Sequence, residues 1–412
     1  MTLPNGGSMT LRCLPLTSTA ASIAECTPYL REILDPTSQN VYYPTAEDTQ
    51  SLPQAAQDTT PSPGTSLVIA TSGTTGTPKL AQLGASQLGA SATATHQVLG
   101  GPGAWLLALP PHHIAGLQVL LRSLAAGYDP QIQDIRTGFS PHGFATATAA
   151  LLERTLDARH YTSLVPTQLH KLLTGDPSDP HISAAQEALT HYDAILVGGA
   201  ALSPDLATQA REQGINIVTT YGSSETAGGC VYNGRPLPGA AVHIDDTGRI
   251  WLGGDTIAHG YLGLPDHPAW QKPGWFRTDD HGHWEEDKHR EEDPTGADKV
   301  LVVDGRMDAA IQSGGLTIFP RIVEEHLNRH PDIAAAAVLG LPDARLGEKV
   351  AAVVVPRSAE TAAGLTVSAL REWLIAAGLD TTATPRTVIP RSSLPTKGIG
   401  KIDYRTLREE LQ

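Results

Sequence analysis

Nine consecutive residues carry the chemical groups that bind a polyphosphate: Thr71, Ser72, Gly73, Thr74, Thr75, Gly76, Thr77, Pro78 and Lys79. They follow the apolar run 66–70, which predicts a strand that leads into a loop. Glycines let the backbone approach phosphate oxygens, hydroxyl and N–H groups donate to them, and the lysine adds a positive charge. The spacing is not that of a Walker A loop. A Ser/Thr/Gly-rich stretch is by composition typical of a solvated linker, but the preceding strand and the lysine favour phosphate binding.

This segment resembles the phosphate-binding loop of the adenylate-forming superfamily, which includes acyl-CoA synthetases, aryl-CoA ligases and adenylation domains of peptide synthetases. The resemblance implies that a carboxylate attacks the α-phosphorus of ATP and that pyrophosphate leaves. Negative charge gathers at phosphorus in the transition state, so cations and oriented donors supply most of the catalysis. Five further segments resemble motifs of the superfamily, and all six occur in the expected order between residues 71 and 403.

The second segment, Leu-Pro-Pro-His-His-Ile-Ala-Gly at 109–116, contains two adjacent histidines. It resembles the superfamily segment that presents an aromatic or histidine side chain beside the acyl carboxylate. The resemblance places His113 there, where it would shield or polarise that carboxylate. A His-His pair next to proline is otherwise a common loop feature.

The third segment, Tyr-Gly-Ser-Ser-Glu-Thr at 221–226, follows a predicted strand at 215–219. It resembles the motif Tyr-Gly-x-Thr-Glu. The resemblance implies that Tyr221 stacks on adenine, that Ser224 donates to the α-phosphate in place of the usual threonine, and that Glu225 holds Mg²⁺. A carboxylate suits Mg²⁺, which takes one or two hard protein oxygens together with phosphate and water.

The fourth and fifth segments concern the ribose and a hinge. Residues 275–282 resemble the motif Thr-Gly-Asp-x-Gly, in which Asp280 would accept hydrogen bonds from the ribose hydroxyls and Asp279 replaces the usual glycine. Residues 305–308 resemble the hinge region, with Arg306 near the ribose and Asp308 absorbing the backbone rotation. Two domains are therefore expected. Residues 1–306 would hold the acid and ATP pocket, and residues 307–412 would form a mobile domain.

The sixth segment, 394–403, resembles the C-terminal catalytic loop Pro-x-x-x-x-Gly-Lys. Lys401 would reach the α-phosphate and the acyl carboxylate and neutralise charge as it develops. Lys397 is the alternative, but glycine directly before the lysine favours Lys401.

Together these segments predict catalytic, ATP-binding and acceptor residues. The predicted catalytic residues are Lys401, Glu225 and His113. The predicted ATP-binding residues are Thr71, Ser72, Gly73, Thr74, Thr75, Lys79, Tyr221, Gly222, Ser223, Ser224, Asp280 and Arg306. The chain shows no carrier-protein segment after Lys401, which favours coenzyme A as the acceptor, and Gly314 and Gly315 would line its thiol tunnel.

The pattern of apolar runs predicts how the fold positions these residues. Strands are expected at 104–110, 161–166, 194–197 and 215–219, with helices between them at 144–158, 167–174 and 204–213. This alternation predicts an α/β fold, in which a large N-terminal domain has helix-covered, mostly parallel sheets. Residues 240–263 predict a β-rich subdomain. The C-terminal residues predict a small α+β domain, with helices at 320–329 and 367–377 and strands at 334–340 and 350–355. Residues 35–65 predict a loop.

Composition limits the classes of partner. The net charge of −14 argues against a broad nucleic-acid or anionic-membrane surface. Three cysteines, Cys13, Cys26 and Cys230, indicate neither a disulfide framework nor a zinc knuckle. The first thirty residues show no signal peptide, and polar side chains interrupt the apolar tract 105–126, so a cytoplasmic protein without membrane insertion is expected. A homo-oligomer is left open. A run of acids and histidines at 279–293 predicts a solvated loop in preference to a metal site.

Three segments narrow the choice of the acid substrate. Residues 161–169, 195–202 and 228–232 look like the corresponding stretches of o-succinylbenzoate–CoA ligases of menaquinone biosynthesis. The resemblance implies a ligase that uses ATP, Mg²⁺ and coenzyme A. Ser163 and Thr167 could equally be a strand-end and a helix-cap residue. The alternatives are another aryl- or short-chain acyl-CoA ligase and, more remotely, a non-catalytic AMP-binding regulator. The predicted substrate pocket comprises His113, Ser163, Thr167, Gly198 and Gly199.

Overall fold

The computed structural model describes residues 10–46, 52–57, 59–71, 78–287, 299–397 and 401–411. The chain divides into two compact units. The first comprises residues 1–202, 206–243 and 251–278, and the second comprises 203–205, 244–250 and 279–412. The predicted boundary between residues 306 and 307 remains a prediction.

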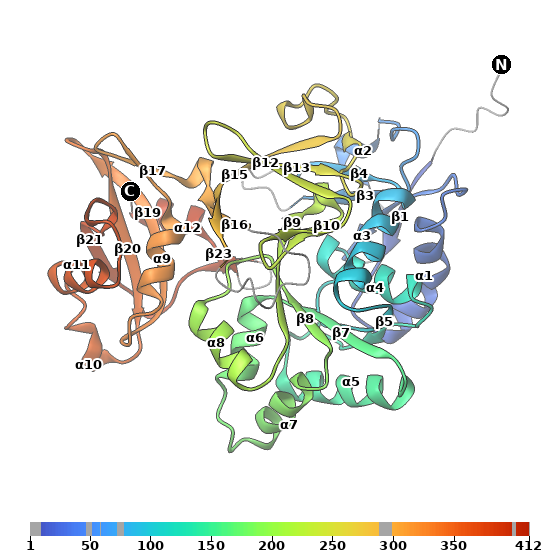
Figure 1. Ribbon diagram of the computed structural model, residues 1–412, viewed down its shortest axis with the longest axis horizontal. Helices are drawn as coiled ribbons and strands as arrows, with labels where there is room; N and C mark the ends of the chain where they lie inside the picture. Colours follow the sequence, from blue (N-terminus) through green and yellow to red (C-terminus); the bar gives the residue numbers. More distant parts are fainter. Residues whose placement is uncertain are drawn as a thin grey trace. The chain divides into compact units, whose positions relative to one another are not determined.

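The first unit contains a five-stranded sheet whose order is β1-β2-β3-β4-β14. Figure 1 labels three of its strands, β1, β3 and β4. Its strands are β1 (Leu11–Pro15), β2 (Val41–Thr45), β3 (Leu67–Ala70), β4 (Leu80–Leu83) and β14 (Gly260–Tyr261). β3 and β4 are antiparallel neighbours, so the predicted phosphate loop connects two adjacent strands. Helices α1 (Ala20–Ile33) and α2 (Gln54–Gln57) precede β3. The expectation of a loop throughout 35–65 was wrong, because β2 and α2 lie there and Val41 is fully buried between its neighbours.

A seven-stranded sheet forms the rest of the core of this unit, in the order β11-β10-β9-β8-β7-β5-β6. Its strands are β5 (Gly103–Leu107), β6 (Gln131–Ile132), β7 (Arg159–Leu164), β8 (Ala194–Val197), β9 (Ile217–Ser223), β10 (Gly228–Tyr232) and β11 (Arg235–Pro236). Strands β6, β5, β7, β8 and β9 are mutually parallel along this order. The predicted parallel sheet is confirmed.

Helix α3 (Ala85–Val98) leads from the first sheet to β5. The helices that connect the parallel strands are α4 (Ile114–Ala125), α5 (Pro141–Arg154), α6 (Pro166–Leu173), α7 (Pro180–Leu189) and α8 (Pro204–Glu212). Apolar side chains of α5, α6 and α7 bury Leu106, Leu164 and Ile195 of the sheet. Helix α7 was not predicted. Proline at its first position and Asp179, which accepts from the backbone N–H of His181, start the helix.

A four-stranded sheet with the order β12-β13-β15-β16 follows. Its strands are β12 (Ala240–Ile244), β13 (Arg249–Gly254), β15 (Trp275–Glu286) and β16 (Lys299–Arg306). The β-rich character of 240–263 is confirmed. The solvated-loop expectation was wrong for 279–286, which lie in β15. There the ring Nδ1 atoms of His281 and His283 contact Asp304 of β16, at 2.7 Å and 3.2 Å, so the alternating histidines belong to strand pairing.

The last part of the second unit is a five-stranded sheet covered by helices. Its strands are β17 (Ile311–Ser313), β18 (Leu316–Ile318), β19 (Ile333–Asp343), β20 (Gly347–Pro356) and β21 (Thr387–Pro390). The helices are α9 (Pro320–Leu327), α10 (Ala359–Ala362), α11 (Val367–Ala376) and α12 (Tyr404–Leu411), and β22 (Thr396–Lys397) pairs with β23 (Lys401–Ile402). Successive residues of β19 point to opposite faces, so Val338 packs with α9 and α11 whereas Leu339 packs with Leu407 of α12. The predicted α+β arrangement of this region is confirmed.

Within the residues described, the helices are all too short or too polar to cross a membrane.

Candidate active site

Four of the predicted segments lie at or just after the carboxyl ends of neighbouring parallel strands. His113 comes after β5, Thr167 after β7 and Gly199 after β8, while Tyr221 lies in the last part of β9. Because β5, β7, β8 and β9 are parallel neighbours, their carboxyl ends meet at one edge of the sheet. Ligands of open α/β sheets bind outside this edge. The fold therefore brings together segments that are more than a hundred residues apart in sequence.

The Tyr221 motif lies inside a strand rather than after it. Strand β9 extends through Ser223, and residues Ser224–Thr226 form a single 3₁₀ turn before β10. Gly222 has φ 157°, and a Cβ there would lie 2.2 Å from the carbonyl oxygen of Gly228. Only glycine allows the two strands to approach this closely. The turn thus presents Ser224 and Glu225 at the strand end.

The ends of the predicted phosphate loop lie beside this turn. The backbone N–H of Thr71 donates to the carbonyl of Lys79 at 2.8 Å, which closes the loop at its base. The Ser224 hydroxyl donates to the carbonyl of Ala70 at 3.4 Å, one residue before the loop. Ser72, Gly73, Thr74 and Thr75 lie outside the described residues, and so do Gly76 and Thr77. Of the described residues that flank the loop, Ala70, directly before it, is the one hydrogen-bonded to Ser224.

Glu225 is held by a tyrosine that the sequence analysis did not single out. Its side chain is 7% exposed, and Oε1 accepts a hydrogen bond of 2.6 Å from the hydroxyl of Tyr261 on β14. The ammonium group of Lys79 lies 5.3 Å from the centre of the Tyr261 ring, within cation–π range. Tyr261 therefore joins the end of the phosphate loop to the carboxylate of Glu225.

The donor set fits Mg²⁺ bound together with a polyphosphate. No group of three or more His, Cys, Asp or Glu side chains suited to a metal occurs among the described residues. A closed protein cage, as for structural zinc, is therefore not formed by these residues. One fixed, nearly buried carboxylate is what Mg²⁺ requires from the protein when phosphate oxygens and water complete its six ligands.

The two histidines start helix α4. His113 is its exposed N-cap residue, with φ −101° and ψ 150°, and its ring lies 4.3 Å from that of His112. Burial, and to a lesser extent the neighbouring His113, lowers the pKa of His112 to about 4, so His112 is neutral at physiological pH. A Cβ on Gly116 would lie 2.2 Å from the carbonyl oxygen of Pro110, so glycine lets α4 begin this close to the strand end.

The other predicted pocket residues differ in exposure. Ser163 is buried in β7, whereas Thr167 is exposed in the first turn of α6. Gly198 has no room for a side chain, since a Cβ would lie 2.3 Å from Oγ1 of Thr220 on β9. Gly199 has φ 81°, a backbone conformation that favours glycine. Both glycines keep the space after β8 free of side chains.

Helix α4 also carries a buried arginine that the sequence analysis missed as a functional residue. Arg122 is 3% exposed, its guanidinium lies 5.5 Å from the Trp105 ring centre, and its Nη2 donates to the Ser91 hydroxyl at 3.5 Å. Among the described residues no ion pair forms at Arg122, and its Nε has no hydrogen-bond partner. Burial lowers its pKa. A buried cation without an anion is costly, so this site favours a negatively charged ligand.

A second polar group accompanies Arg122 on the same helix face. Gln118, one turn earlier, donates from Nε2 to the carbonyl of Ala227 at 2.6 Å, but its Oε1 has no partner among the described residues. Ala227 itself has φ 52°, a left-handed conformation that is strained for alanine. The signal in the sequence was the four-residue spacing of Gln118 and Arg122 in an otherwise apolar tract, which served there only to reject a membrane span.

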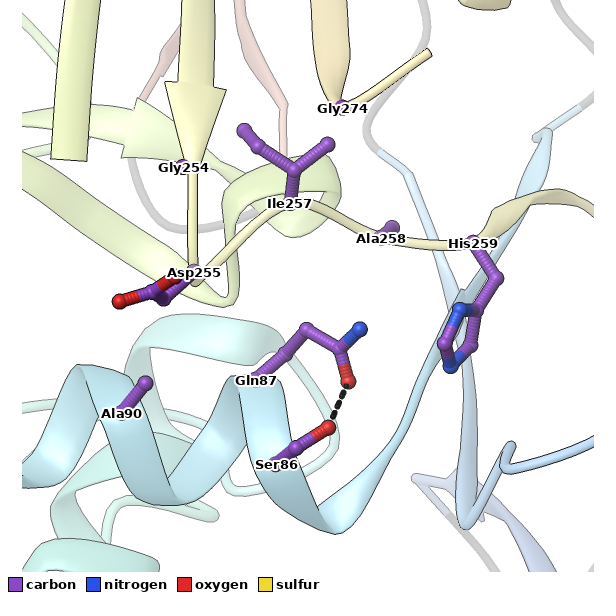
Figure 2. A pocket seen from close by; sticks show the side chains of 9 residues that line it. All are labelled: Ser86, Gln87, Ala90, Gly254, Asp255, Ile257, Ala258, His259 and Gly274. Atoms are coloured by element: carbon purple, nitrogen blue, oxygen red, sulfur yellow. Dashed lines mark hydrogen bonds between the residues drawn. The ribbon is translucent and has the colours of Figure 1, made fainter. Parts of the chain in front are cut away.

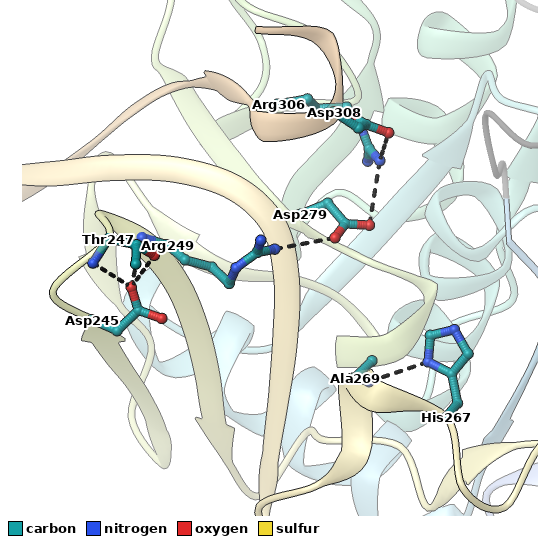
Figure 3. A network of polar contacts seen from close by, with 8 residues as sticks. All are labelled: Asp245, Thr247, Arg249, His267, Ala269, Asp279, Arg306 and Asp308. Atoms are coloured by element: carbon teal, nitrogen blue, oxygen red, sulfur yellow. Dashed lines mark hydrogen bonds and ion pairs between the residues drawn. The ribbon is translucent and has the colours of Figure 1, made fainter. Parts of the chain in front are cut away.

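The second unit contains a separate group of predicted residues, centred on Arg306 (Figure 3). Asp280 of β15 pairs in register with Arg306 of β16. The guanidinium of Arg306 donates two hydrogen bonds of 2.7 Å to Asp308 and lies 3.5 Å from Asp279. The hydrogen bonds to Asp308 are the main cause of the raised pKa of Arg306. Asp279, at the position where glycine is usual, also pairs with Arg249 at 3.1 Å.

The remaining predicted residues are in the same unit. Gly314 (φ 62°) and Gly315 (φ 83°) form the two-residue turn between β17 and β18. Positive φ at both central residues is the pattern of a type I′ hairpin, which explains the glycine pair structurally. The backbone of Lys401 lies in β23, opposite Lys397 in β22. Residues 398–400 between them lie outside the described residues.

A cavity of about 660 Å³ opens elsewhere in the first unit (Figure 2). The first turn of α3 forms one side, where the Ser86 hydroxyl donates to Oε1 of Gln87, and the segment around Asp255 and Ile257 forms the other. The predicted site residues do not line it. One lining residue contacts the candidate site, because the N–H of Ala258 donates to the carbonyl of Glu225 at 2.9 Å.

Comparison with known proteins identifies related families and structures. The profile of the AMP-binding enzyme family matches residues 16–262, and that of the AMP-binding enzyme C-terminal domain matches residues 322–401. A probable 2-succinylbenzoate–CoA ligase of Mycobacterium tuberculosis is 45% identical over 341 residues, which cover 83% of each chain. The 2-succinylbenzoate–CoA ligase of Enterococcus faecalis is 30% identical over 70% of this chain and 59% of its own length.

A solved structure is similar throughout most of the fold. The O-succinylbenzoate coenzyme A synthetase of Bacillus subtilis, in complex with ATP and a magnesium ion, is 26% identical and superimposes with a TM-score of 0.66. The match covers 84% of this chain and 70% of that protein. The predicted fold class, with a large N-terminal and a small C-terminal part, is confirmed by this likeness.

Proposed function

This chain belongs to the AMP-binding enzyme family, and we propose that it is an AMP-forming acid–CoA ligase that converts o-succinylbenzoate to its coenzyme A thioester in menaquinone biosynthesis. The observation that carries the reaction type is the position of the phosphate-loop ends beside the Glu225 turn. The Ser224 hydroxyl donates to the carbonyl of Ala70, and Lys79 lies over the ring of Tyr261, which donates to Glu225. The ligases that the chain resembles support the choice of acid.

Each predicted nucleotide-binding residue has a role in this proposal. The loop from Thr71 to Lys79 holds the β- and γ-phosphates with N–H, hydroxyl and ammonium groups, and Ser224 donates to the α-phosphate. Tyr221, with Gly222 and Ser223 beside it, stacks on adenine. Asp280 and Arg306 bind the ribose. Glu225 holds Mg²⁺, which neutralises phosphate charge when bound.

Adenylation is an in-line displacement at phosphorus. An oxygen of the succinyl carboxylate bonds to the α-phosphorus while the bond to the pyrophosphate oxygen breaks. Lys401 neutralises the charge that develops on the α-phosphate, and His113 shields the reacting carboxylate from water at the start of α4. The product is the acyl adenylate.

Thioester formation follows a rotation of the C-terminal domain about Asp308. This rotation withdraws Lys401 and brings Gly314 and Gly315 beside the pantetheine arm of coenzyme A. The thiol sulfur then bonds to the acyl carbon, AMP leaves, and the thiol proton is released. The ion pair between Arg306 and Asp308 must rearrange in this step, since both side chains adjoin the hinge.

In this proposal Arg122 binds the second carboxylate of the acid. The substrate is a dicarboxylate, and only one of its carboxylates reacts. Arg122 is a buried cation with an unpartnered Nε, and Gln118 beside it has an unpartnered oxygen. A carboxylate at this position replaces an unpaired buried charge by a charge-assisted hydrogen bond. Ser163, Thr167, Gly198 and Gly199 form the wall of the pocket at the ends of β7 and β8.

The proposal uses small-molecule partners: the acid, ATP and coenzyme A. It needs no nucleic acid and no membrane insertion, and it holds for a monomer or a homo-oligomer. We place the protein in the cytoplasm, where ATP and coenzyme A are available. The alternative is another aryl- or short-chain acyl-CoA ligase with the same machinery, and Arg122 separates the two because a monocarboxylate leaves it unpaired.

The test is pyrophosphate release from MgATP with o-succinylbenzoate, benzoate, salicylate and medium-chain acids, each with and without coenzyme A. A strong preference for o-succinylbenzoate, with its thioester identified by mass, supports the proposal. Preference for a monocarboxylate would show that o-succinylbenzoate is not the substrate, while the proposed ligase reaction would stand. ATP binding without pyrophosphate release with any acid would indicate a non-catalytic nucleotide-binding protein.

A further inference from the structure

A tyrosine three residues after Lys401 is hydrogen-bonded to a carboxylate of another helix. The hydroxyl of Tyr404, the first residue of α12, donates to Oε1 of Glu324 on α9 at 2.7 Å. The backbone N–H of Val338 on β19 donates to the same oxygen, also at 2.7 Å. One carboxylate oxygen therefore joins α9, β19 and the start of α12.

The short chain segment between Lys401 and Tyr404 is held by contacts on both sides of Asp403. Lys401 and Ile402 pair with β22, and the N–H of Asp403 donates to the carbonyl of Pro395 at 2.8 Å. Ile402 packs against the cluster that contains the fully buried Leu407 of α12. Because these contacts constrain the chain on both sides of Asp403, the position of Tyr404 is transmitted to the backbone of Lys401.

Glu324 is suited to respond to its surroundings. Burial raises its pKa to about 7, against the opposing effect of the hydrogen bonds from Tyr404 and Val338. The nearest charges are on its own helix, where Arg321 and Glu325 pair with each other at 2.9 Å. From α12 it faces Tyr404, and β19 contributes the N–H of Val338. The partner tyrosine therefore provides the only side-chain hydrogen bond to Glu324 that is found among the described residues.

We propose that Tyr404 is a positioning residue for Lys401: its hydrogen bond to Glu324 holds the start of α12, and thereby the backbone of the catalytic lysine, against the C-terminal sheet. This inference rests on the proposed role of Lys401 in adenylation. The bond is strongest when Glu324 is ionised, since a charged acceptor strengthens a hydrogen bond. The adenylation rate of the wild type therefore rises as pH increases through about 7.

The test compares Tyr404→Phe with Glu324→Gln. Phenylalanine keeps the ring but removes the donor, whereas glutamine keeps an acceptor oxygen for Tyr404 and Val338 but cannot ionise. Glu409→Gln, which alters an exposed ion pair with Arg405 on the same helix, is the matched control. Thermal unfolding of each variant establishes that it folds.

Amide hydrogen exchange measures, without any catalytic assay, how firmly residues 401–407 are held. At pH 5, where Glu324 is protonated, we expect Tyr404→Phe to speed exchange about tenfold in residues 401–407 and to leave β20 unchanged, with Glu324→Gln close to the wild type. Unchanged exchange in 401–407, or acceleration across the whole second unit, overturns the proposal.

The rates of the two half-reactions then show whether the loss of this hydrogen bond impairs Lys401. Tyr404→Phe should lower kcat of pyrophosphate release about tenfold, leave KM for ATP and acid unchanged, and spare thioester formation from supplied acyl-AMP. Glu324→Gln should retain most of the rate and lose its rise with pH. Equal loss in both half-reactions overturns the positioning role. If the wild type releases no pyrophosphate with any acid, the proposed function fails, and hydrogen exchange alone decides whether Tyr404 holds this segment.

Discussion

Two arginines in different regions of this protein differ in whether the chain supplies a carboxylate partner. Arg306 lies between Asp279 and Asp308, both of which neutralise it. Arg122 is buried against Trp105 and, among the described residues, has no carboxylate partner. A cation whose partners are in the chain can serve as part of a structural or hinge network. A buried cation without one lowers the stability of the fold and is explained best by a ligand that supplies the anion.

The largest expected effect comes from a third cation, Lys401, which we propose acts on the charge that develops during the reaction. We expect Lys401→Ala to lower pyrophosphate release by about 10³-fold, because it removes a charge that acts on the transition state. Thioester formation from supplied acyl-AMP should continue at the wild-type rate. Rapid quench of each half-reaction measures both. Equal loss in the two half-reactions would show that Lys401 has been assigned the wrong role.

Arg122→Met tests the unpaired arginine directly. The change should raise KM for o-succinylbenzoate about 100-fold, since a charge-assisted bond to its second carboxylate is lost, while KM for ATP stays the same. Stability should be unchanged or higher, because an apolar side chain of similar length replaces an unpaired buried charge. Steady-state kinetics and thermal unfolding provide the two measurements. A lower melting temperature with an unchanged KM would assign Arg122 to the core instead of the substrate.

The pH dependence of stability should differ between the two units. Burial, together with Arg122, lowers the pKa of His96 to about 4, and its Nε2 accepts from the indole N–H of Trp105. The folded state then binds fewer protons than the unfolded state, so stability falls as pH decreases from 6.5 towards 4, by on the order of 2 kcal/mol. Glu324 has a raised pKa, so its contribution is present below pH 4.5 and is lost as pH rises through about 7.

Hydrogen exchange at pH 5 and pH 8 distinguishes these contributions, because it reports each unit separately. His96→Gln should weaken the acid sensitivity of the first unit, and Glu324→Gln should remove the loss of stability in the second unit at higher pH. The same pH dependence in both units and in both variants would contradict the assignment of these two groups.

Asp279→Gly restores the residue usual at this position and should have the smallest effect. The variant loses the contacts of Asp279 with Arg249 and Arg306, which are partly solvent-exposed, so stability should fall by less than about 1 kcal/mol. We expect KM for ATP to change no more than about threefold, because Asp308 still holds Arg306. A large rise in KM for ATP would show that Asp279, and not Asp308, keeps Arg306 in place for the ribose.

Local sequence patterns predicted much of the scaffold. Strand β8 occurs at 194–197 as expected, because an apolar run of four residues that ends at a glycine is too short for a buried helix and is typical of a buried strand. The sequence singled out Gly222 as an ATP-binding residue and Gly314 and Gly315 as tunnel residues. The structure adds that Gly222 permits a close approach of two strands and that Gly314 and Gly315 have positive φ. The predictions failed where tertiary contacts outweighed local composition, as in β15, where polar residues that suggest a loop pair across to Asp304.

The sequence by itself determined the family resemblance, the order of the six motifs and the periodic pattern of strands and helices, because these depend on residue types close together along the chain. Only the tertiary structure decided that Tyr261 holds Glu225, that Tyr404 meets Glu324 and that Arg122 is buried without a carboxylate among the described residues. Each of these observations depends on residues from different elements that meet only in the folded chain. Whether a polar side chain is solvated, paired or left for a ligand depends on its neighbours in space, and no local pattern in the sequence contains that information.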